Sequence, residues 1–353
     1  MKRYLTVLAL TATIINACKK EETTVIHDPN PVDTSFRPVQ PGGNTKKSRL
    51  LLITPPGSFV SKDSAWPNGD GHTYLLESNT FPITANNAAL IFPGAAFKGS
   101  TVTDGIFTPL TGYTYKPASV GATLTYTNAS TLMDPPSASA TQLFLKRFFQ
   151  GNATYPSNGI SWGISGDLYY DRIQVAYADQ SPVPTGATDS TGGGFYMSYE
   201  QRLYSVYMDI PKDGQLFTTP VSEATAQDNP LYVSDIKYGR RGILVFTLKY
   251  STPFDLAALR IIAGKASRHE GMTGAEMLLL GRTNIRYYAQ HEGTGGIMTA
   301  QTLDLPALQQ VFASLQQLRG ATAENPGAAI AFSLSNLKTH ALTPMNSRID
   351  VQE

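Results

Sequence analysis

The longest hydrophobic pattern in the chain runs from Tyr232 to Tyr250 and reads YVSDIKYGRRGILVFTLKY. Aromatic and β-branched residues dominate it, which predicts a β-strand. The run is about three times as long as the usual strand of 5–6 residues. Gly239 lies inside it, and a glycine within a strand indicates a bend or a close approach of another backbone. We therefore expect one long strand that bends or is crowded near Gly239.

Alternation of apolar and polar positions predicts further strands. Phe195–Ile210 gives the strongest of these patterns because it is dense in aromatic residues. The other predicted strands are Leu50–Ile53, Gly112–Tyr126, two runs within Ile160–Tyr177, Ala275–Ala289 and Ala328–Leu334.

Apolar residues spaced three and four apart predict helices between these strands. Ser139–Gln150 is the first. The second has Thr252 as its N-cap, Pro253 in its first position and Gly264 beyond its end. Asp304–Arg319 is the third and has the clearest apolar stripe. Long strands and helices without regular βαβ alternation predict an α+β fold with an antiparallel sheet.

The N-terminus has the pattern of a secretory signal. Lys2 and Arg3 precede an apolar run that is too short to span a membrane, and small residues lead to Cys18. Because Cys18 is the single cysteine, no disulfide is expected. We expect residues 1–17 to be a lipoprotein signal peptide and Cys18 to be lipidated. The alternative is an ordinary signal peptide with an incidental cysteine.

Residues 18–48 are rich in Pro, Thr, Asn and Gly, which predicts a flexible tether. Its first charged residues, Lys19–Glu22, resemble the surface-export tags of Bacteroidetes lipoproteins, although a solvated tether would look similar. We expect a bacterial outer-membrane lipoprotein that faces outward rather than into the periplasm, with residues 49–353 as the folded domain.

Charge and motifs argue against several functional classes. The net charge is +1 with no basic block in the folded domain, so nucleic acid is not an expected partner. No nucleophile elbow, zinc-binding helix motif, phosphate loop or dinucleotide fingerprint is present. We therefore predict that the chain is not an enzyme and needs no cofactor or metal.

Two groups of acidic residues are candidates for a functional site, although a plain structural role is favoured for both. Asp167, Asp171 and Asp209 are candidate catalytic carboxylates, although acidic residues at strand ends usually face water. Asp63–Gly71 has oxygen ligands near glycines and is a candidate calcium loop, with a plain turn as the favoured alternative.

Four segments together resemble the thiol-activated (cholesterol-dependent) cytolysins, which are pore-forming toxins of the MACPF/CDC superfamily. Tyr232–Arg240 resembles the family's Tyr-Val-Ser-x-x-x-Tyr-Gly-Arg, and Glu200–Pro211 resembles its Gln-x-Phe-Tyr-Thr-Val-x-x-Asp-x-Pro. Leu90–Gly94 and Leu278–Gly281 resemble two shorter motifs and follow in the same order. The family positions retained here are Gln201, Tyr204, Val206, Asp209, Pro211, Tyr238, Gly239, Arg240 and Gly281.

The resemblance implies an elongated α+β body with a central, twisted, four-stranded antiparallel sheet and flanking helical clusters. Its strands would lie near Ile160–Tyr177, Phe195–Ile210, Tyr232–Tyr250 and Ala275–Ala289. It also implies a target membrane, a ring of subunits, either identical or mixed with a related protein, and refolding of the helical clusters into amphipathic hairpins that line a pore.

The sequence departs from the family at three places. The cholesterol-recognition domain is not matched before Glu353, so cholesterol binding is not expected. Ala178–Gly194 is too short and too rich in proline for a membrane hairpin, whereas Ser251–Gly274 is long enough but carries charges that suit a solvated helix. Arg282 replaces the second glycine of a Gly-Gly pair at the family's sheet bend, which would restrict that hinge.

Two functions therefore remain in view. One is a pore-forming protein or a partner-dependent component of a pore. The other is a non-lytic surface lipoprotein that uses the same scaffold to bind a glycan or a protein.

Overall fold

The computed structural model describes residues 50–53, 58–69, 71–102, 106–123, 128–132, 134–151, 161–168, 172–175, 183–184, 193–209, 215–248, 252–291, 299–316, 320–322 and 325–352. The predicted signal peptide, Cys18, the tether and Pro211 lie outside these residues, as does most of Ala178–Gly194.

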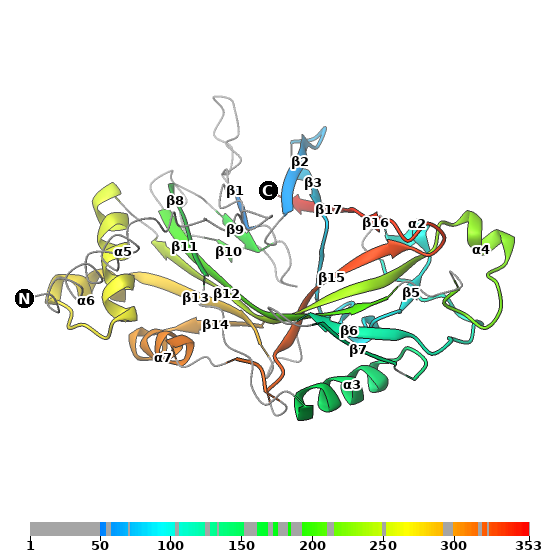
Figure 1. Cartoon of the computed structure of the whole chain (residues 1–353). Coiled ribbons are helices and arrows are strands. Elements are labelled where there is room, and N and C mark those ends of the chain that lie inside the picture. Colours follow the sequence, from blue (N-terminus) through cyan, green and yellow to red (C-terminus); the bar gives the residue numbers. More distant parts are fainter. Residues whose placement is uncertain are drawn as a thin grey trace, which may run out of the picture. The chain divides into compact units, whose positions relative to one another are not determined.

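Two long antiparallel strands form the centre of the fold, and together we call them the ribbon (Figure 1). They are β11 (Gly193–Met208) and β12 (Leu231–Leu248). Their pairing runs from Gly193 opposite Leu248 to Tyr207 opposite Asp235. The two longest predicted strands are thus confirmed.

Each strand of the ribbon changes its outer partner halfway along. The first half of β11 pairs with β8 (Ser161–Leu168), and its second half pairs with β6 (Ser119–Thr123), which in turn pairs with β7 (Asn128–Leu132). The first half of β12 pairs with β15 (Ala328–Asn336). Its second half pairs with β13 (Thr283–Gln290), which carries β14 (Thr299–Leu303). All of these pairs are antiparallel.

The predicted four-stranded core appears as the neighbours β8, β11, β12 and β13, and it belongs to a larger sheet of 11 strands. The remaining strands of that sheet are short: β4 (Phe81–Pro82) and β16 (Leu342–Thr343) on β15, and β5 (Ala96–Phe97) on the start of β12. The second half of the predicted Ile160–Tyr177 region leaves this sheet. It forms β9 (Arg172–Val175), which pairs with β1 (Leu50–Ile53) and β10 (Val183–Pro184).

A third sheet joins segments from the two ends of the described chain. Its order is β17 (Met345–Gln352), β3 (Gly71–Ser78) and β2 (Ser58–Ala65). The predicted strand Gly112–Tyr126 is wrong in its first part, where Tyr115 makes only an isolated bridge and regular pairing begins at Ser119. Pro117 explains the late start, because proline cannot donate to a strand ladder.

The three predicted helices are present as α3 (Ala138–Gly151), α5 (Pro253–Ser267) and α7 (Leu305–Gln316). Thr252 caps α5 as predicted, and Asp304 Oδ1 accepts a hydrogen bond from the Ala307 amide at 2.9 Å at the start of α7. The predicted end of α5 before Gly264 is wrong. The helix continues because Ala266, in its last turn, is fully buried against the sheet, and that packing outweighs the poor helix propensity of one glycine. The short helices are η1 (Ala88–Leu90), α2 (Gly99–Val102) and α4 (Glu223–Gln227).

The predicted strand Ala275–Ala289 is wrong in its first half, which forms helix α6 (Gly274–Gly281) before β13 begins. A capping box starts this helix. The Glu276 amide donates to Thr273 Oγ1 at 3.3 Å, and the Thr273 amide donates to Glu276 Oε2 at 2.7 Å. Both orphan donors are therefore satisfied in the helical form.

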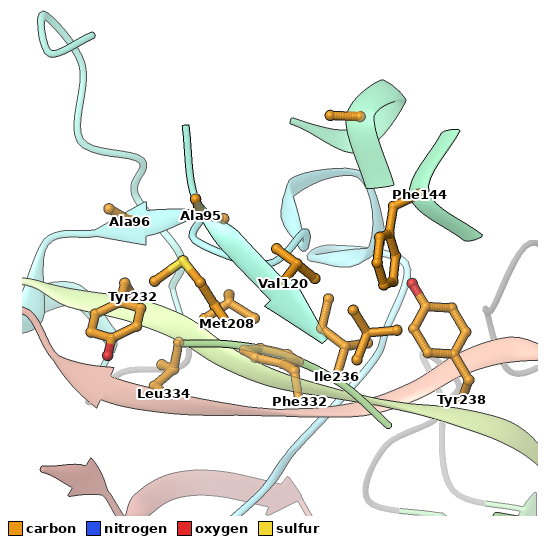
Figure 2. Packing of buried hydrophobic residues seen from close by; sticks show 14 of the residues in the cluster. Ala95, Ala96, Val120, Phe144, Met208, Tyr232, Ile236, Tyr238, Phe332 and Leu334 are labelled. Atoms are coloured by element: carbon orange, nitrogen blue, oxygen red, sulfur yellow. The ribbon is translucent and has the colours of Figure 1, made fainter. Parts of the chain in front are cut away.

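Two hydrophobic cores lie at opposite ends of the ribbon. The first joins the second half of β11 and the first half of β12 to α3, β6 and β15, and Figure 2 shows Val120, Met208, Ile236 and Phe332 meeting there, with Phe144 of α3 beside Tyr238. The second joins the other half of the ribbon to α5, α6, α7 and β13. Among the described helices, none is long and apolar enough to cross a membrane.

Candidate functional site

The middle of the ribbon gathers most of the predicted site residues, and we call it the waist. It consists of Gln201–Tyr204 on β11 and Tyr238–Arg241 on β12. Here both strands exchange one outer partner for another. Gln201, Tyr204, Tyr238, Gly239 and Arg240 were predicted from separate motifs, and the structure brings them together across one strand pair.

The expected crowding at Gly239 is confirmed. The register of the ribbon shifts between Arg202 and Tyr204, so Leu203 is an extra residue in a β-bulge. A Cβ atom on Gly239 would lie 2.1 Å from the carbonyl oxygen of Gln201. The backbones approach so closely that only glycine fits at this position.

Arg240 is almost completely buried, with 5% of its surface exposed. Its Nη1 donates to Gln201 Oε1 at 3.0 Å, and its Nη2 donates to Asn325 Oδ1 at 2.9 Å. Gln201 is itself 2% exposed. The guanidinium group therefore connects β11 to the segment that leads into β15.

Arg241 was missed as a site residue, although it is 3% exposed and its Nε donates to Gln290 Oε1. Gln290 is fully buried, and its amide donates to the carbonyl oxygens of Ile83 at 3.4 Å and Ala329 at 3.3 Å. The signal was present in the sequence. Two adjacent arginines within an apolar strand must find hydrogen-bond partners if they are buried.

Buried tyrosines lie within the waist and next to it. Tyr204 and Tyr238 stack with ring centroids 4.9 Å apart, and burial raises the pKa of Tyr238 well above its ordinary value. Towards the other core, the Tyr199 and Tyr287 hydroxyl groups share a hydrogen bond. Burial raises the pKa of both, so these phenols stay neutral. They serve as packing and hydrogen-bonding groups.

Partly buried charges lie beside the waist on β12. Burial raises the pKa of Asp235 and lowers the pKa of Lys237. Burial and then the positive charge of Arg240 lower the pKa of His291. Within the described residues, no cluster of His, Cys, Asp and Glu could hold a metal ion. The arrangement is suited to fixing a backbone geometry.

The other predicted positions lie elsewhere. Asp209, at the end of β11, accepts a hydrogen bond from Ser119 Oγ at 2.6 Å and thereby fastens β11 to β6. Gly281 is the exposed last residue of α6, and Arg282 is the C-cap of that helix, so the expected sheet bend is a helix end here. Asp63 contacts His72 Nδ1 at 2.6 Å near the connection between β2 and β3, and Asp70 of the candidate calcium loop lies outside the described residues.

The helices α5 and α6 form an insertion between the antiparallel neighbours β12 and β13, and we call them the insertion (Figure 1). One side of it is fixed to the sheet. Leu259 and Ile262 are fully buried, and the Arg260 guanidinium lies 5.7 Å from the ring centre of Phe195 on β11. Lys265 Nζ also donates to both carboxylate oxygens of Glu276 at 2.7 and 2.9 Å, which joins the two helices.

The other side of the insertion exposes large apolar side chains. Phe254 is 86% exposed and Leu278 is 75% exposed. Ile261 and Met277 are 58% and 46% exposed. These four belong to the few large hydrophobic residues that the described part of the chain leaves in solvent. Large apolar side chains that stay in water are unfavourable, because their surface is hydrated instead of buried.

No model of a known protein family matches the chain, and no curated protein matches its sequence. Solved structures do match its fold. Listeriolysin O is 14% identical with a TM-score of 0.57, over 88% of this chain and 69% of that one. Suilysin from Streptococcus suis, a cytotoxin, is 14% identical with a TM-score of 0.55, over 85% and 71%. A non-hemolytic pneumolysin from Streptococcus pneumoniae strain ST306 is 15% identical with a TM-score of 0.56, over 86% and 70%. The chain therefore has the fold of the cholesterol-dependent cytolysins.

Proposed function

We propose that the chain is a subunit of a membrane pore, which assembles with copies of itself or with a related protein. The proposed activity is mechanical, because no covalent bond is made or broken. The cytolysin fold, which pore-forming toxins use, supports this proposal over most of the chain. At identities near 14%, that support concerns the fold, so the activity has to rest on features of this chain.

The exposed apolar side of the insertion carries the proposal. Antiparallel neighbours such as β12 and β13 need only a short turn between them, yet residues 249–282 join them and include two helices. If the insertion faced a bilayer or a neighbouring subunit, the exposed side chains of Phe254 and Leu278 would be covered. In water they are apolar surface without cover.

The position of the insertion allows it to lengthen the sheet. The β12–β13 ladder ends at Leu248 opposite Thr283. A membrane-spanning strand needs about 9–11 residues, so residues 249–282 suffice for two such strands and a turn. If the insertion refolds as a hairpin, it continues the existing register. Release requires loss of the Lys265–Glu276 pair and of the Arg260 contact with Phe195.

In the proposed pore, a partner subunit supplies a lipid-facing hairpin that Ala178–Gly194 of this chain cannot form. Ala178–Gly194 carries Pro182 and Pro184 and few large apolar residues, so it does not suit a lipid-facing hairpin. A related chain with a suitable hairpin would complete the wall of the pore. We therefore infer a mixed assembly, with the lipid on Cys18 holding this subunit to the bacterial outer membrane.

Release of a dye from vesicles tests the pore. We expect the mature chain, together with a related chain that has a suitable hairpin, to permeabilise vesicles of phosphatidylcholine with or without cholesterol. Phe254→Ser and Leu278→Ser should abolish release while the folded structure is kept, because both side chains are exposed. Phe59→Ser is the matched control, since Phe59 is 59% exposed on β2, away from the insertion. Intact vesicles in every combination, together with capture of a glycan or protein, would establish the non-lytic alternative.

Metabolic labelling with a fatty acid tests the anchor. Cys18→Ser should lose the label and leave the protein in the soluble fraction. Protease added to whole cells should cut the anchored wild-type protein if it faces outward. Protection until the outer membrane is broken would instead place the protein in the periplasm.

A further inference from the structure

The waist is also the branch point of the large sheet. The same edge of β12 carries β15 as far as Gly239 and β13 from Arg241 onwards. Ala328, the first residue of β15, pairs with Gly239, and Gln290, the last residue of β13, pairs with Arg241. Arg240 lies between these pairs, where one neighbouring strand ends and the other begins.

Arg240 holds one side of this branch. Its guanidinium group joins Gln201 on β11 to Asn325, three residues before β15. Asn325 is fixed by a small turn, in which its amide donates to Thr322 Oγ1 at 3.0 Å and its carbonyl accepts from the Thr322 amide at 2.9 Å. The entry into β15 is therefore fastened to β11 across β12.

Arg241 holds the other side. Its partner Gln290 closes β13 and donates to the Ala329 carbonyl at 3.3 Å, at the start of β15. Gln290 also donates to the Ile83 carbonyl at 3.4 Å, and the Ile83 amide donates to the Ile330 carbonyl at 3.2 Å. The ends of β13 and β15 are thus tied to each other through one buried amide.

Consecutive side chains of a strand point to opposite faces of the sheet. The contacts of Arg240 therefore lie on one face of the ribbon and those of Arg241 on the other. Both guanidinium groups are buried, and a buried charge that loses hydrogen bonds is costly. Partial opening at either face would leave such a charge poorly satisfied. Networks of this kind therefore resist small distortions and open as a unit.

We propose that Arg240 and Arg241 form a two-sided clamp that fixes where β13 and β15 diverge from β12. The two halves of the sheet change their relative angle only when Asn325 and Gln290 release the two arginines. The clamp is a property of the folded chain in solution. Its use as a brake on pore assembly rests on the proposed function.

Hydrogen exchange in the folded protein, without vesicles, tests the clamp. Asn325→Ala removes a partner of Arg240 from an exposed position, so the fold should survive. We expect exchange at Ala328–Ile330 to become about tenfold faster, because local opening loses a charge-assisted hydrogen bond. Gln290→Leu should do the same at both Tyr288–Gln290 and Ala328–Ile330. Asn284→Ala, an exposed change on β13 outside the clamp, should leave both segments as in wild type.

The pairing of β3 with β17 provides an internal reference, since that sheet is separate from the ribbon. Unchanged exchange in Asn325→Ala, or an equal increase in the β3–β17 pair, would overturn the clamp. Release of dye from vesicles tests the second role of the clamp, as a brake on pore assembly. Asn325→Ala should permeabilise vesicles several-fold faster than wild type. Vesicles that stay intact with the wild-type protein and the related partner chain together count against the proposed function, whereas hydrogen exchange still decides the clamp.

Discussion

Tyr199 on β11 and Tyr287 on β13 place their hydroxyl oxygens 2.7 Å apart, although β12 lies between their strands. Gly242 on β12 makes this contact possible. A Cβ atom at Gly242 would lie 2.5 Å from the Tyr199 ring, so the missing side chain leaves the path across β12 open. Three neighbouring strands are fastened beneath the insertion by one hydrogen bond between side chains.

Tyr199→Phe should therefore lower the free energy of unfolding by about 1–2 kcal/mol, because it leaves the buried Tyr287 hydroxyl without this partner. Urea unfolding measures the change. The Tyr199→Phe/Tyr287→Phe double variant is the control, and it should lose less than the sum of the two single variants. Strictly additive losses would mean that the two hydroxyls do not stabilise each other.

The free energy of unfolding should fall at alkaline pH, because ionisation of tyrosine favours the unfolded chain, in which the rings are exposed. Burial raises the pKa of Tyr199, Tyr238 and Tyr287 above the ordinary value of 10.0. The folded chain then keeps protons that the unfolded chain releases, so this stabilising contribution is complete below pH 10 and declines as the pH rises beyond it. Tyrosinate absorbance should appear together with loss of the near-ultraviolet circular dichroism. Full ionisation near pH 10 in a folded protein would refute the burial of these rings.

Two glycines should respond in opposite ways to alanine. Gly239→Ala forces a Cβ atom towards the Gln201 carbonyl oxygen, 2.1 Å away, and should cost about 3 kcal/mol or more or prevent folding. Gly281→Ala meets nothing within 4 Å at the end of α6. It should be neutral or stabilising by up to about 1 kcal/mol. Thermal unfolding compares them, and equal effects would contradict the crowding at the waist.

Asp235→Asn should stabilise the protein at neutral pH by up to about 1 kcal/mol. Burial is the largest influence on the Asp235 carboxyl and raises its pKa above 3.8, against the opposing influence of Lys237. A raised carboxyl pKa gives a stabilising contribution below the unfolded value that is lost as the pH rises through the folded value. Wild type and variant should thus be equally stable near pH 3 and differ at pH 7. A variant that is less stable at pH 7 would show that the pair with Lys237 outweighs burial.

The ribbon was predictable because its signals are local. β11 and β12 are dense in aromatic and aliphatic residues over 16 and 18 residues, and the N-cap residues of α5 and α7 directly precede their helices. The α6 region was misassigned because AEMLLLG is apolar at both the helical and the strand period. The capping signature from Thr273 to Glu276 would have resolved it in favour of a helix.

The waist was only half predictable, and the reason is distance along the chain. Gly239 and Arg240 were marked by their motif. Two partners of the arginines, Gln290 and Asn325, come from distant parts of the chain. Pattern analysis assigns elements one at a time, and these residues meet only after the elements have assembled. The exposed side of the insertion was hidden for a similar reason, since its apolar residues read as ordinary core positions until the burial of Leu259 and Ile262 showed which side faces the sheet.

The pairing of the third sheet has a consequence for how the chain folds. β3 near residue 75 needs β17 near residue 349, and β4 needs β15 from the same distant region. Contacts of such long sequence separation must wait until β17 has been synthesised, and they close large loops before they yield stabilising energy. The chain is therefore expected to fold slowly, with β3 and β4 left without these partners until β15 and β17 have been synthesised.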